Sequence, residues 1–376
     1  MTTISRAHPF VPRKLIGAML LACASMVCRT PGAAGAAELK PAVQRPIAAE
    51  MILTYRGAER QKLLEQGAKK EGKIVWFATL NPETRDRIAA AFKLKYPFLS
   101  FETARVETAE LLKQVLEEYK AGKHDIDLVE VSYPGAVGLK MAGNLAKFSS
   151  PVLQGIPAAA IDPDHYFFAD RENPLALGFN TNLVPAATAP TTYDDLLSPN
   201  WRGKLSTQNN AQAVQYFGAL AHLKGEEYLR KLAQQGFALQ DGAAREVAQL
   251  VAAGKVMMMI PVSISHPLTL QKKGVPIAYR VLEPAPTAVG YIAALNQAPH
   301  PHAAALLMDF ILSDPGQQIM TDSGSGAVRK GIANPYPDFK KLYIDFLVPQ
   351  NQYEAEYKKW SDLHQSLFVK GAPLAK

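Results

Sequence analysis

The stretch Ala68–Leu80, AKKEGKIVWFATL, decides the fold class. Its first residues continue a helix that is predicted from about Ala58 to Lys70, and Gly72 ends this helix. The next six residues, Lys73–Ala78, form a nearly continuous apolar run, which is typical of a parallel strand that is covered on both faces. A helix followed by such a strand predicts an α/β domain with a mostly parallel sheet.

The same alternation continues along the chain. Strands are predicted at Ser100–Ala104 and Asp127–Val131, with the helix Ala109–Tyr119 between them, whose leucines and valine form one apolar stripe. Four later apolar runs also predict strands, at residues 175–179, 205–207, 256–262 and 288–295. Helices are expected to end near residue 223, to fill much of 303–320 and to follow near the C-terminus.

Length and charge restrict the class of protein. A chain of 376 residues with 48% hydrophobic and 20% charged residues suits two globular domains. The net charge is +7, but residues 1–36 hold four basic residues and no acidic one, so the remainder carries only +3. This excess is too small for a nucleic-acid-binding surface and is compatible with a small anionic ligand.

The first 36 residues have the pattern of a secretory signal peptide. Arg13 and Lys14 precede the apolar run Leu15–Ala22, and small residues follow up to Ala34–Ala36. The apolar run is shorter than the roughly 20 residues of a membrane-spanning helix. We therefore expect export to the periplasm, and an uncleaved membrane anchor is the other interpretation.

Both cysteines of the chain, Cys23 and Cys28, lie inside this segment. Cleavage after about Ala36 would leave a mature protein without disulfides or thiol chemistry. The stretch Leu20–Cys23 also resembles a lipoprotein cleavage site, so lipid attachment at Cys23 is an alternative.

Most enzyme motifs are absent. The sequence has no H-E-x-x-H, G-x-S-x-G, P-loop or Rossmann glycine pattern. Ser323–Gly326 lacks the first glycine of a nucleophile motif around Ser325 and reads as a turn. His300 and His302 could hold a metal ion or simply precede a helix. No cofactor and no catalytic residue are predicted.

Polar residues follow several predicted strands, and each could either bind a ligand or cap a helix. In parallel sheets, ligands bind beyond the carboxyl ends of strands, where helix N-termini favour anions. Several such residues at equivalent positions predict a shared cleft. They are Thr79, Arg105, Ser132, Thr207, Gln208, Asn209, Ser263 and Ser265.

Arg105 stands between a strand and a helix, where two roles are open. A guanidinium can hold a carboxylate or phosphate through two hydrogen bonds. It could instead form a surface salt bridge with Glu102 or Glu107.

Several stretches together resemble the periplasmic solute-binding proteins of ABC importers, in the branch that includes ferric-iron, phosphonate and thiamine binders. The similarity spans most of residues 55–335, and each motif is weak alone. It is carried by residues 55–60, 68–80, 127–132 and 178–181, by 194–197 with 201–204, and by 308–313 with 315–318.

The resemblance implies the type II periplasmic-binding-protein fold. Two α/β lobes would be joined by two crossing segments near Leu175–Asn182 and Arg280–Ala288, and would close around a ligand by a hinge motion. The implied division, after a signal peptide at residues 1–36, is a first lobe over 37–180, an inserted second lobe over 181–283, and a return to the first lobe with C-terminal helices over 284–376.

One departure from the iron-binding relatives stands out. They carry adjacent tyrosines after the strand that matches Val256–Val262, whereas this chain has Ser263–His266 there. Neutral hydroxyls cannot replace two phenolates for Fe(III), so they favour an oxyanion. His266 could donate a hydrogen bond, bind a metal or begin a helix. Tyr133 and Tyr291 remain as possible phenolates.

The main hypothesis is a periplasmic protein that binds a small anionic organic solute, a phosphonate, phosphate ester or carboxylate, for an ABC importer. We expect a monomer whose partners are the solute and the importer's membrane subunits, with no nucleic acid and no bound metal. The alternatives are a ferric-iron-binding protein and, from another class, a secreted hydrolase. The predicted ligand-binding residues are Thr79, Arg105, Ser132, Asn180, Thr207, Asn209, Ser263, Ser265, His266 and Tyr291.

Overall fold

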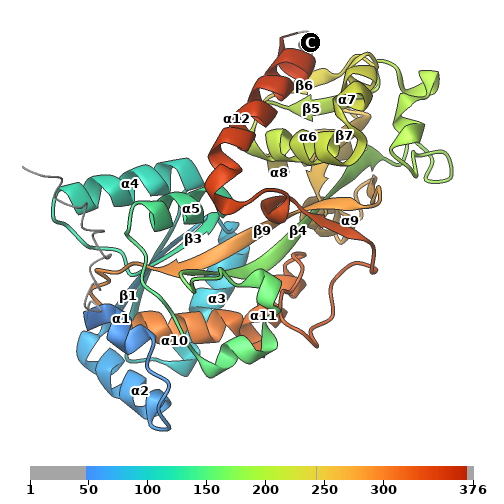
Figure 1. The fold of residues 1–376 in the computed structure, drawn as a ribbon. Helices are drawn as coiled ribbons and strands as arrows, with labels where there is room; N and C mark the ends of the chain where they lie inside the picture. Colours follow the sequence, from blue (N-terminus) through green and yellow to red (C-terminus); the bar gives the residue numbers. More distant parts are fainter. Residues whose placement is uncertain (1–47, 243, 371–376) are drawn as a thin grey trace, which may run out of the picture. The chain divides into compact units, whose positions relative to one another are not determined.

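A computed structural model describes residues 48–242 and 244–370 (Figure 1). Its strands are β1 Lys73–Ala78, β2 Ser100–Arg105, β3 Leu128–Ser132, β4 Phe167–Asn180, β5 Leu205–Gln208, β6 Ala238–Gln240, β7 Met258–Ser263, β8 Ile277–Arg280, β9 Ala285–Ala294 and β10 Lys341–Tyr343. The predicted signal peptide and both cysteines lie outside the described residues.

The α-helices alternate with these strands. They are α1 Ala48–Leu53, α2 Arg60–Glu71, α3 Pro82–Lys95, α4 Thr108–Lys120, α5 Tyr133–Met141, α6 Ala211–Lys224, α7 Glu226–Ala233, α8 Ala244–Ala252, α9 Ser265–Gln271, α10 Pro301–Leu312, α11 Asp314–Asp322 and α12 Tyr353–His364. Short 3-10 turns include η5 Ile344–Phe346 and η6 Gln350–Gln352. In the described part of the chain, no helix has the length and apolar character that a membrane crossing requires.

The strands follow the order β2-β1-β3-β9-β4-β7-β5-β6, with β10 beside β9 and β8 beside β4. β1 pairs in parallel with both β2 and β3, as the apolar strand Lys73–Ala78 predicts. In Figure 1, α4 and α5 lie on one side of this part of the sheet, and α2 and α10 lie on the other. Trp76 of β1 is fully buried between them.

The long strand β4 connects the two parts of the sheet. Its first half, Phe167–Pro174, pairs with β9, and its second half, Leu175–Asn180, pairs with β7 and β8. Beyond it, β5 pairs in parallel with β6 and β7. The predicted α/β class, with mostly parallel pairing among helix-linked strands, is confirmed.

β4 begins eight residues earlier than the sequence predicts, at Phe167 instead of Leu175. The charged triplet Asp170-Arg171-Glu172 interrupts the apolar pattern and hides the strand. All three side chains are nevertheless buried, with at most 9% of each residue exposed. Charged residues reach such burial only when they are paired, and this cluster contributes to the candidate site.

The C-terminal helix α12 packs against α6, as Figure 1 shows. Phe368, just beyond α12, stacks on Phe217 of α6 with 4.0 Å between ring centroids. Near the start of α12, Tyr353 accepts a hydrogen bond of 3.0 Å from Gln215. The last described segment is therefore anchored on the part of the structure that contains β5 and β7.

Candidate functional site

A cavity of about 330 Å³ opens where the carboxyl ends of β1, β2 and β7 face α8 and α9. We call it the cleft. Its polar lining comes from both parts of the sheet, as the placement of ligands beyond strand ends leads one to expect. The lining residues are Thr79, Leu80, Asn81, Pro82, Arg105, Arg171, Asn173, Gln212, Ala244, Arg245, Glu246, Ser263, Ser265, His266 and Ser325.

Thr79 is held at the end of β1 by a buried carboxylate. Its backbone N–H and its hydroxyl each donate a 2.8 Å hydrogen bond to Glu130 of β3, and Leu80 donates a third at 3.1 Å. The hydroxyl therefore positions the strand end. The same hydroxyl oxygen accepts a 3.3 Å hydrogen bond from Nη2 of Arg171.

Arg171 lies at the base of the cleft between two acids. It is ion-paired with Glu130 and, at 3.1 Å, with Asp170. The pairing register of β4 with β9 shifts by one residue between Ala169 and Arg171, as a β-bulge would cause. Burial, reinforced by the charge of Glu130, raises the pKa of Asp170 to about 8. Glu130 and Arg171 thus form a buried ion pair, and Asp170 lies beside it in an environment that favours the protonated acid.

Glycine is required beside this cluster. A Cβ atom at Gly290 of β9 would lie 2.1 Å from Nη1 of Arg171 and 2.7 Å from Oε1 of Glu130. The guanidinium therefore packs directly on the backbone of β9, which fixes its position at the cleft.

Arg105 forms the salt bridge that its position allows, and it also lines the cleft. Its Nη2 lies 2.5 Å from Oε1 of Glu107, and it also lines the cleft with 41% of its side chain exposed. Arg245 of α8 lines the opposite part of the cleft. An exposed ion pair such as that of Arg105 contributes little to stability, so this guanidinium can exchange its partner for a ligand at small cost.

The end of β7 contributes neutral groups. The hydroxyls of Ser263 and Ser265 lie 3.1 Å apart, and His266 follows in the first turn of α9. Burial, with a smaller contribution from the charge of Arg245, lowers the pKa of His266 to about 4. His266 is therefore uncharged at neutral pH and offers one donor and one acceptor.

The charge balance of the cleft is positive. Its described lining contains three arginines, one glutamate and no tyrosine. The acids that pair with Arg171 and Arg105, Glu130 and Glu107, lie outside this lining. A ligand anion that displaces the exposed Glu107 from Arg105 would gain a guanidinium. Throughout residues 48–242 and 244–370, no group of three or more histidine, cysteine, aspartate or glutamate side chains is suited to hold a metal ion.

The cleft brings together five of the ten predicted residues: Thr79, Arg105, Ser263, Ser265 and His266. All five stand at or just after the carboxyl ends of β1, β2 and β7, and these ends meet at the cleft.

The other five lie elsewhere. Ser132 bonds to Thr108, with 3.0 Å between the hydroxyls, and the amide of Asn180 donates to the last carbonyls of α8. Thr207 is fully buried in β5, and Asn209 accepts a 2.6 Å hydrogen bond from Gln365. Tyr291 lines a separate cavity.

Several cleft residues are not predicted from the sequence. Arg171 is hidden in the charged triplet of β4, and Arg245 begins a helix that carries no motif. Asn173, Gln212 and Ser325 also line the cleft. The available signal for Arg171 is an arginine flanked by two acids inside an apolar stretch, which indicates a buried ion-pair cluster. Ser325 belongs to the Ser323–Gly326 turn.

The predicted histidine pair forms two separate contacts. Nδ1 of His300 lies 2.9 Å from Asp127, and Nδ1 of His302 lies 2.5 Å from Glu71. Each histidine thus ties the start of α10 to a different acidic residue.

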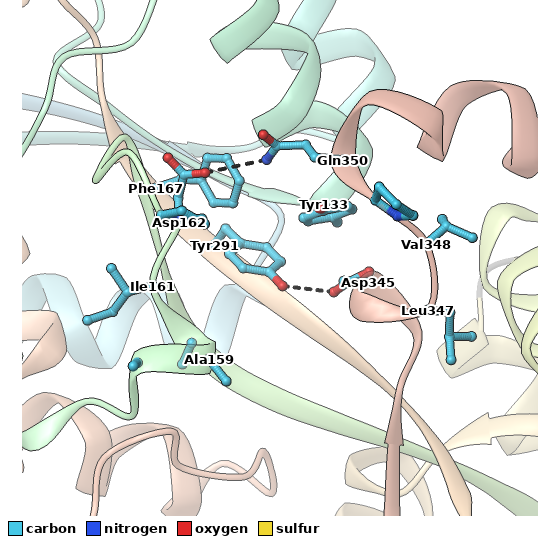
Figure 2. A pocket seen from close by; sticks show the side chains of 14 residues that line it. Tyr133, Ala159, Ile161, Asp162, Phe167, Tyr291, Asp345, Leu347, Val348 and Gln350 are labelled. Carbon is cyan, nitrogen blue, oxygen red and sulfur yellow. Dashed lines mark hydrogen bonds between the residues drawn. The ribbon is translucent and has the colours of Figure 1, made fainter.

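Tyr133 and Tyr291 are neighbours, with 5.5 Å between ring centroids, and both line a second cavity, which Figure 2 shows. Tyr291 donates a 3.0 Å hydrogen bond to Asp345. Burial raises the pKa of Tyr133 to about 12, and that of Tyr291 well above its ordinary value. Both phenols are protonated at neutral pH and neither belongs to the cleft.

Solved structures of binding proteins share this fold. Iron-bound HitA from Pseudomonas aeruginosa has 20% identity and a TM-score of 0.66, covering 77% of this chain and 99% of its own. Trichodesmium IdiA (FutA), in complex with iron and citrate ligands, has 17% identity and a TM-score of 0.66, with coverages of 80% and 100%. A substrate-binding protein of an ABC transporter from Agrobacterium tumefaciens has 13% identity and a TM-score of 0.67, with coverages of 77% and 94%.

At such identities these structures support the fold alone, and they agree with the predicted periplasmic-binding-protein architecture. No curated protein sequence matches the chain significantly. The sequence profile of the bacterial extracellular solute-binding proteins matches residues 139–344, which is more than half of the 376 residues. The chain therefore belongs to the bacterial extracellular solute-binding protein family, as its sequence resemblance predicts.

Proposed function

We propose that this protein is the periplasmic solute-binding component of an ABC import system and that it captures its solute in the cleft. Family membership supports solute binding, and the cleft offers polar groups from both parts of the sheet. The membrane subunits of the importer are its partner, and binding rather than catalysis is its role.

The relatives favour ferric iron over an organic anion as the cargo. HitA is described as iron-bound, and IdiA (FutA) is described with iron and citrate. On these comparisons the ferric alternative has more support than the anionic organic solute that the sequence alone favours.

The residues of the cleft favour one form of that cargo. Three arginines, three serines and an uncharged histidine suit the oxygens of a carboxylate, whereas the described lining has no phenolate for a bare Fe(III) ion. An iron carboxylate chelate with net negative charge, such as ferric citrate, fits both the relatives and the cleft. The observation that carries this proposal is the arginine-rich, tyrosine-free lining.

The second candidate is an organic anion without iron, and the same lining favours it. Calorimetric titration with ferric citrate, citrate, ferric nitrilotriacetate and 2-aminoethylphosphonate separates the two. Binding of ferric citrate at least tenfold tighter than citrate supports the chelate, while equal or tighter binding of citrate or phosphonate supports the organic anion. A visible phenolate-to-iron absorbance band after ferric loading would contradict the tyrosine-free site.

The hydrolase alternative is tested on the same protein. Incubation with ester, phosphate-ester and glycoside panels should give no turnover. Reproducible turnover that His266→Ala abolishes would replace the binding proposal with an enzymatic one.

A further inference from the structure

A second cavity, of about 590 Å³, lies apart from the cleft (Figure 2). We call it the side cavity. It is walled by residues 158–163, by Tyr291 of β9 and by the segment 345–350. It shares no lining residue with the cleft. Its volume is in the range of small-molecule sites in proteins, roughly 300–1,000 Å³.

Much of the side cavity is aromatic or aliphatic. Tyr133, Phe167 and Tyr291 pack against one another, with ring centroids 5.3–6.0 Å apart. Alanines and the side chains of Ile161, Leu347 and Val348 complete the apolar wall. Aromatic rings attract cations through the negative potential of their faces.

One buried acid of the wall lacks a cation. Asp345 is 1% exposed and accepts a 3.0 Å hydrogen bond from Tyr291. No lysine or arginine in the part of the chain that the structure describes forms an ion pair with it. Burial raises the pKa of Asp345 to about 7, although its hydrogen bonds with Tyr291 and with the backbone at Val289 act in the opposite direction.

The other acid of the wall, Asp162, differs from Asp345 in having a lysine partner. Oδ1 of Asp162 lies 2.7 Å from Nζ of Lys140, so its charge is already compensated. The amide of Gln350 also reaches Asp162, at 3.4 Å, as the dashed line in Figure 2 shows. Asp345 is thus the acid whose charge a ligand would compensate.

We propose that the side cavity binds a small organic cation, an amine with an apolar or aromatic body, whose ammonium group pairs with Asp345 beside the rings of Tyr133 and Tyr291. The apolar wall takes the body, and the buried acid fixes the charged end. This site is independent of the solute cleft.

Part of the wall of the side cavity lies beyond the residues that the family profile matches. The family profile ends at residue 344, immediately before Asp345 and the segment 345–350. A site built partly from residues beyond the profile goes beyond the solute-binding function proposed for the cleft.

Calorimetry with phenethylamine as the probe tests the proposal, using the uncharged 2-phenylethanol as its matched analogue. We expect saturable binding of the amine, at least about tenfold tighter than the alcohol, because only the amine pairs with a carboxylate. Asp345→Asn keeps the shape and the acceptor for Tyr291, and should weaken the amine at least about tenfold while leaving the alcohol unchanged.

Asp362→Asn is the matched control, because it makes the same change at an exposed acid of α12 that pairs with Lys358. It should bind the amine as the wild type does. If Asp345→Asn does not fold, Leu347→Trp, which fills the cavity, should abolish amine binding instead. Equal binding of amine and alcohol, an unchanged affinity in both cavity variants, or no saturable amine binding would overturn the proposal.

Discussion

At the scale of single residues, Arg105 and Arg171 have different positions and roles in the cleft. Arg171 is buried and neutralised by Glu130, so it organises the base of the site. Arg105 is partly exposed, and its partner Glu107 is even more exposed. A ligand oxygen can replace Glu107 at Arg105 without leaving a buried charge unpaired, whereas a change at Arg171 would leave one.

The Arg105 role gives the first prediction. Arg105→Ala should weaken binding of ferric citrate about tenfold, or about 1.4 kcal/mol. Removing a half-exposed guanidinium costs less binding free energy than removing a buried one. Arg105→Lys should recover part of this loss, since the ammonium keeps the charge but not the planar pair of donors. Calorimetry measures both.

Arg230→Ala is the matched control, because Arg230 forms a comparably exposed ion pair with Glu226 on α7. It should leave the affinity within about twofold. An Arg105→Ala protein that binds ferric citrate like the wild type would remove Arg105 from the site.

Asp345 gives a prediction about stability and pH. Its folded-state pKa is raised to about 7, whereas an unfolded aspartate has a pKa near 3.9. The stability contributed by this group is therefore fully present below about pH 4 and is lost as the pH rises through 7. The ceiling of the loss is about 4 kcal/mol, from the difference in pKa.

Asp345→Asn should accordingly gain stability relative to the wild type between pH 4.5 and pH 8, by a few kcal/mol at most. Urea unfolding at the two pH values measures the difference, and Asp362→Asn should show no such gain. A wild type and an Asp345→Asn protein with parallel pH dependence would show that Asp345 titrates normally.

At the scale of elements, the contact between α12 and α6 depends on a neutral histidine. His364 is fully buried and stacks on Phe217, with centroids 5.6 Å apart, and on Phe368, at 5.9 Å. Burial lowers its pKa to about 4, below the unfolded value near 6.5. Its stabilising contribution is present above pH 6.5 and is lost as the pH falls toward 4.

Replacing His364 with phenylalanine should therefore remove part of the acid sensitivity of the protein. Between pH 7 and pH 4.5 the wild type should lose up to about 3 kcal/mol more than His364→Phe, from the difference in pKa. His222→Phe, at an exposed position of α6, serves as control. Unfolding curves that move in parallel for all three proteins would contradict this role.

The elements also show what could be predicted from the sequence. The bounds of β1 are predicted at Lys73–Ala78 and observed there, because an apolar strand covered on both faces leaves a continuous pattern. The first half of β4 is missed, because its buried charges pair with residues distant in the sequence. Periodicity detects burial of apolar groups, and it cannot detect ion pairs whose partners only the fold supplies.

The same limit applies to the site. Thr79 and Ser263 are predicted from their places after strands, and the topology brings them together. Arg171 depends on the register shift between β4 and β9, and Tyr291 on the side of the sheet that it faces. Neither is encoded in a local motif, because one additional residue in a strand reverses the direction of every side chain beyond it.

At the scale of the whole molecule, the proposed division into lobes over residues 37–180, 181–283 and 284–376 can be compared with the strand pairing. β4 passes from pairing with β9 to pairing with β7 near Leu175, where the sequence predicts a crossing. The segment after residue 344 returns toward α6 through α12. A chain that links both parts of the sheet at its C-terminus provides a route by which two ligand sites could influence each other.

The last prediction tests that route. The cleft and the side cavity share no lining residue, so ferric citrate and phenethylamine should stabilise the protein independently. Each ligand at 100 times its dissociation constant should add about 2.7 kcal/mol to the free energy of unfolding. Together they should add about 5.4 kcal/mol, within roughly 0.5 kcal/mol, as expected for two sites that share no lining residue. Denaturant unfolding with each ligand and with both measures this sum.

A larger or smaller sum would give the coupling free energy between the two sites directly. Because coupling is reciprocal, the same factor must then appear in the affinity of either ligand when it is titrated in the presence of the other. In that case Tyr353→Phe, which keeps the ring but removes the hydroxyl that contacts Gln215, should reduce the coupling if α12 carries it.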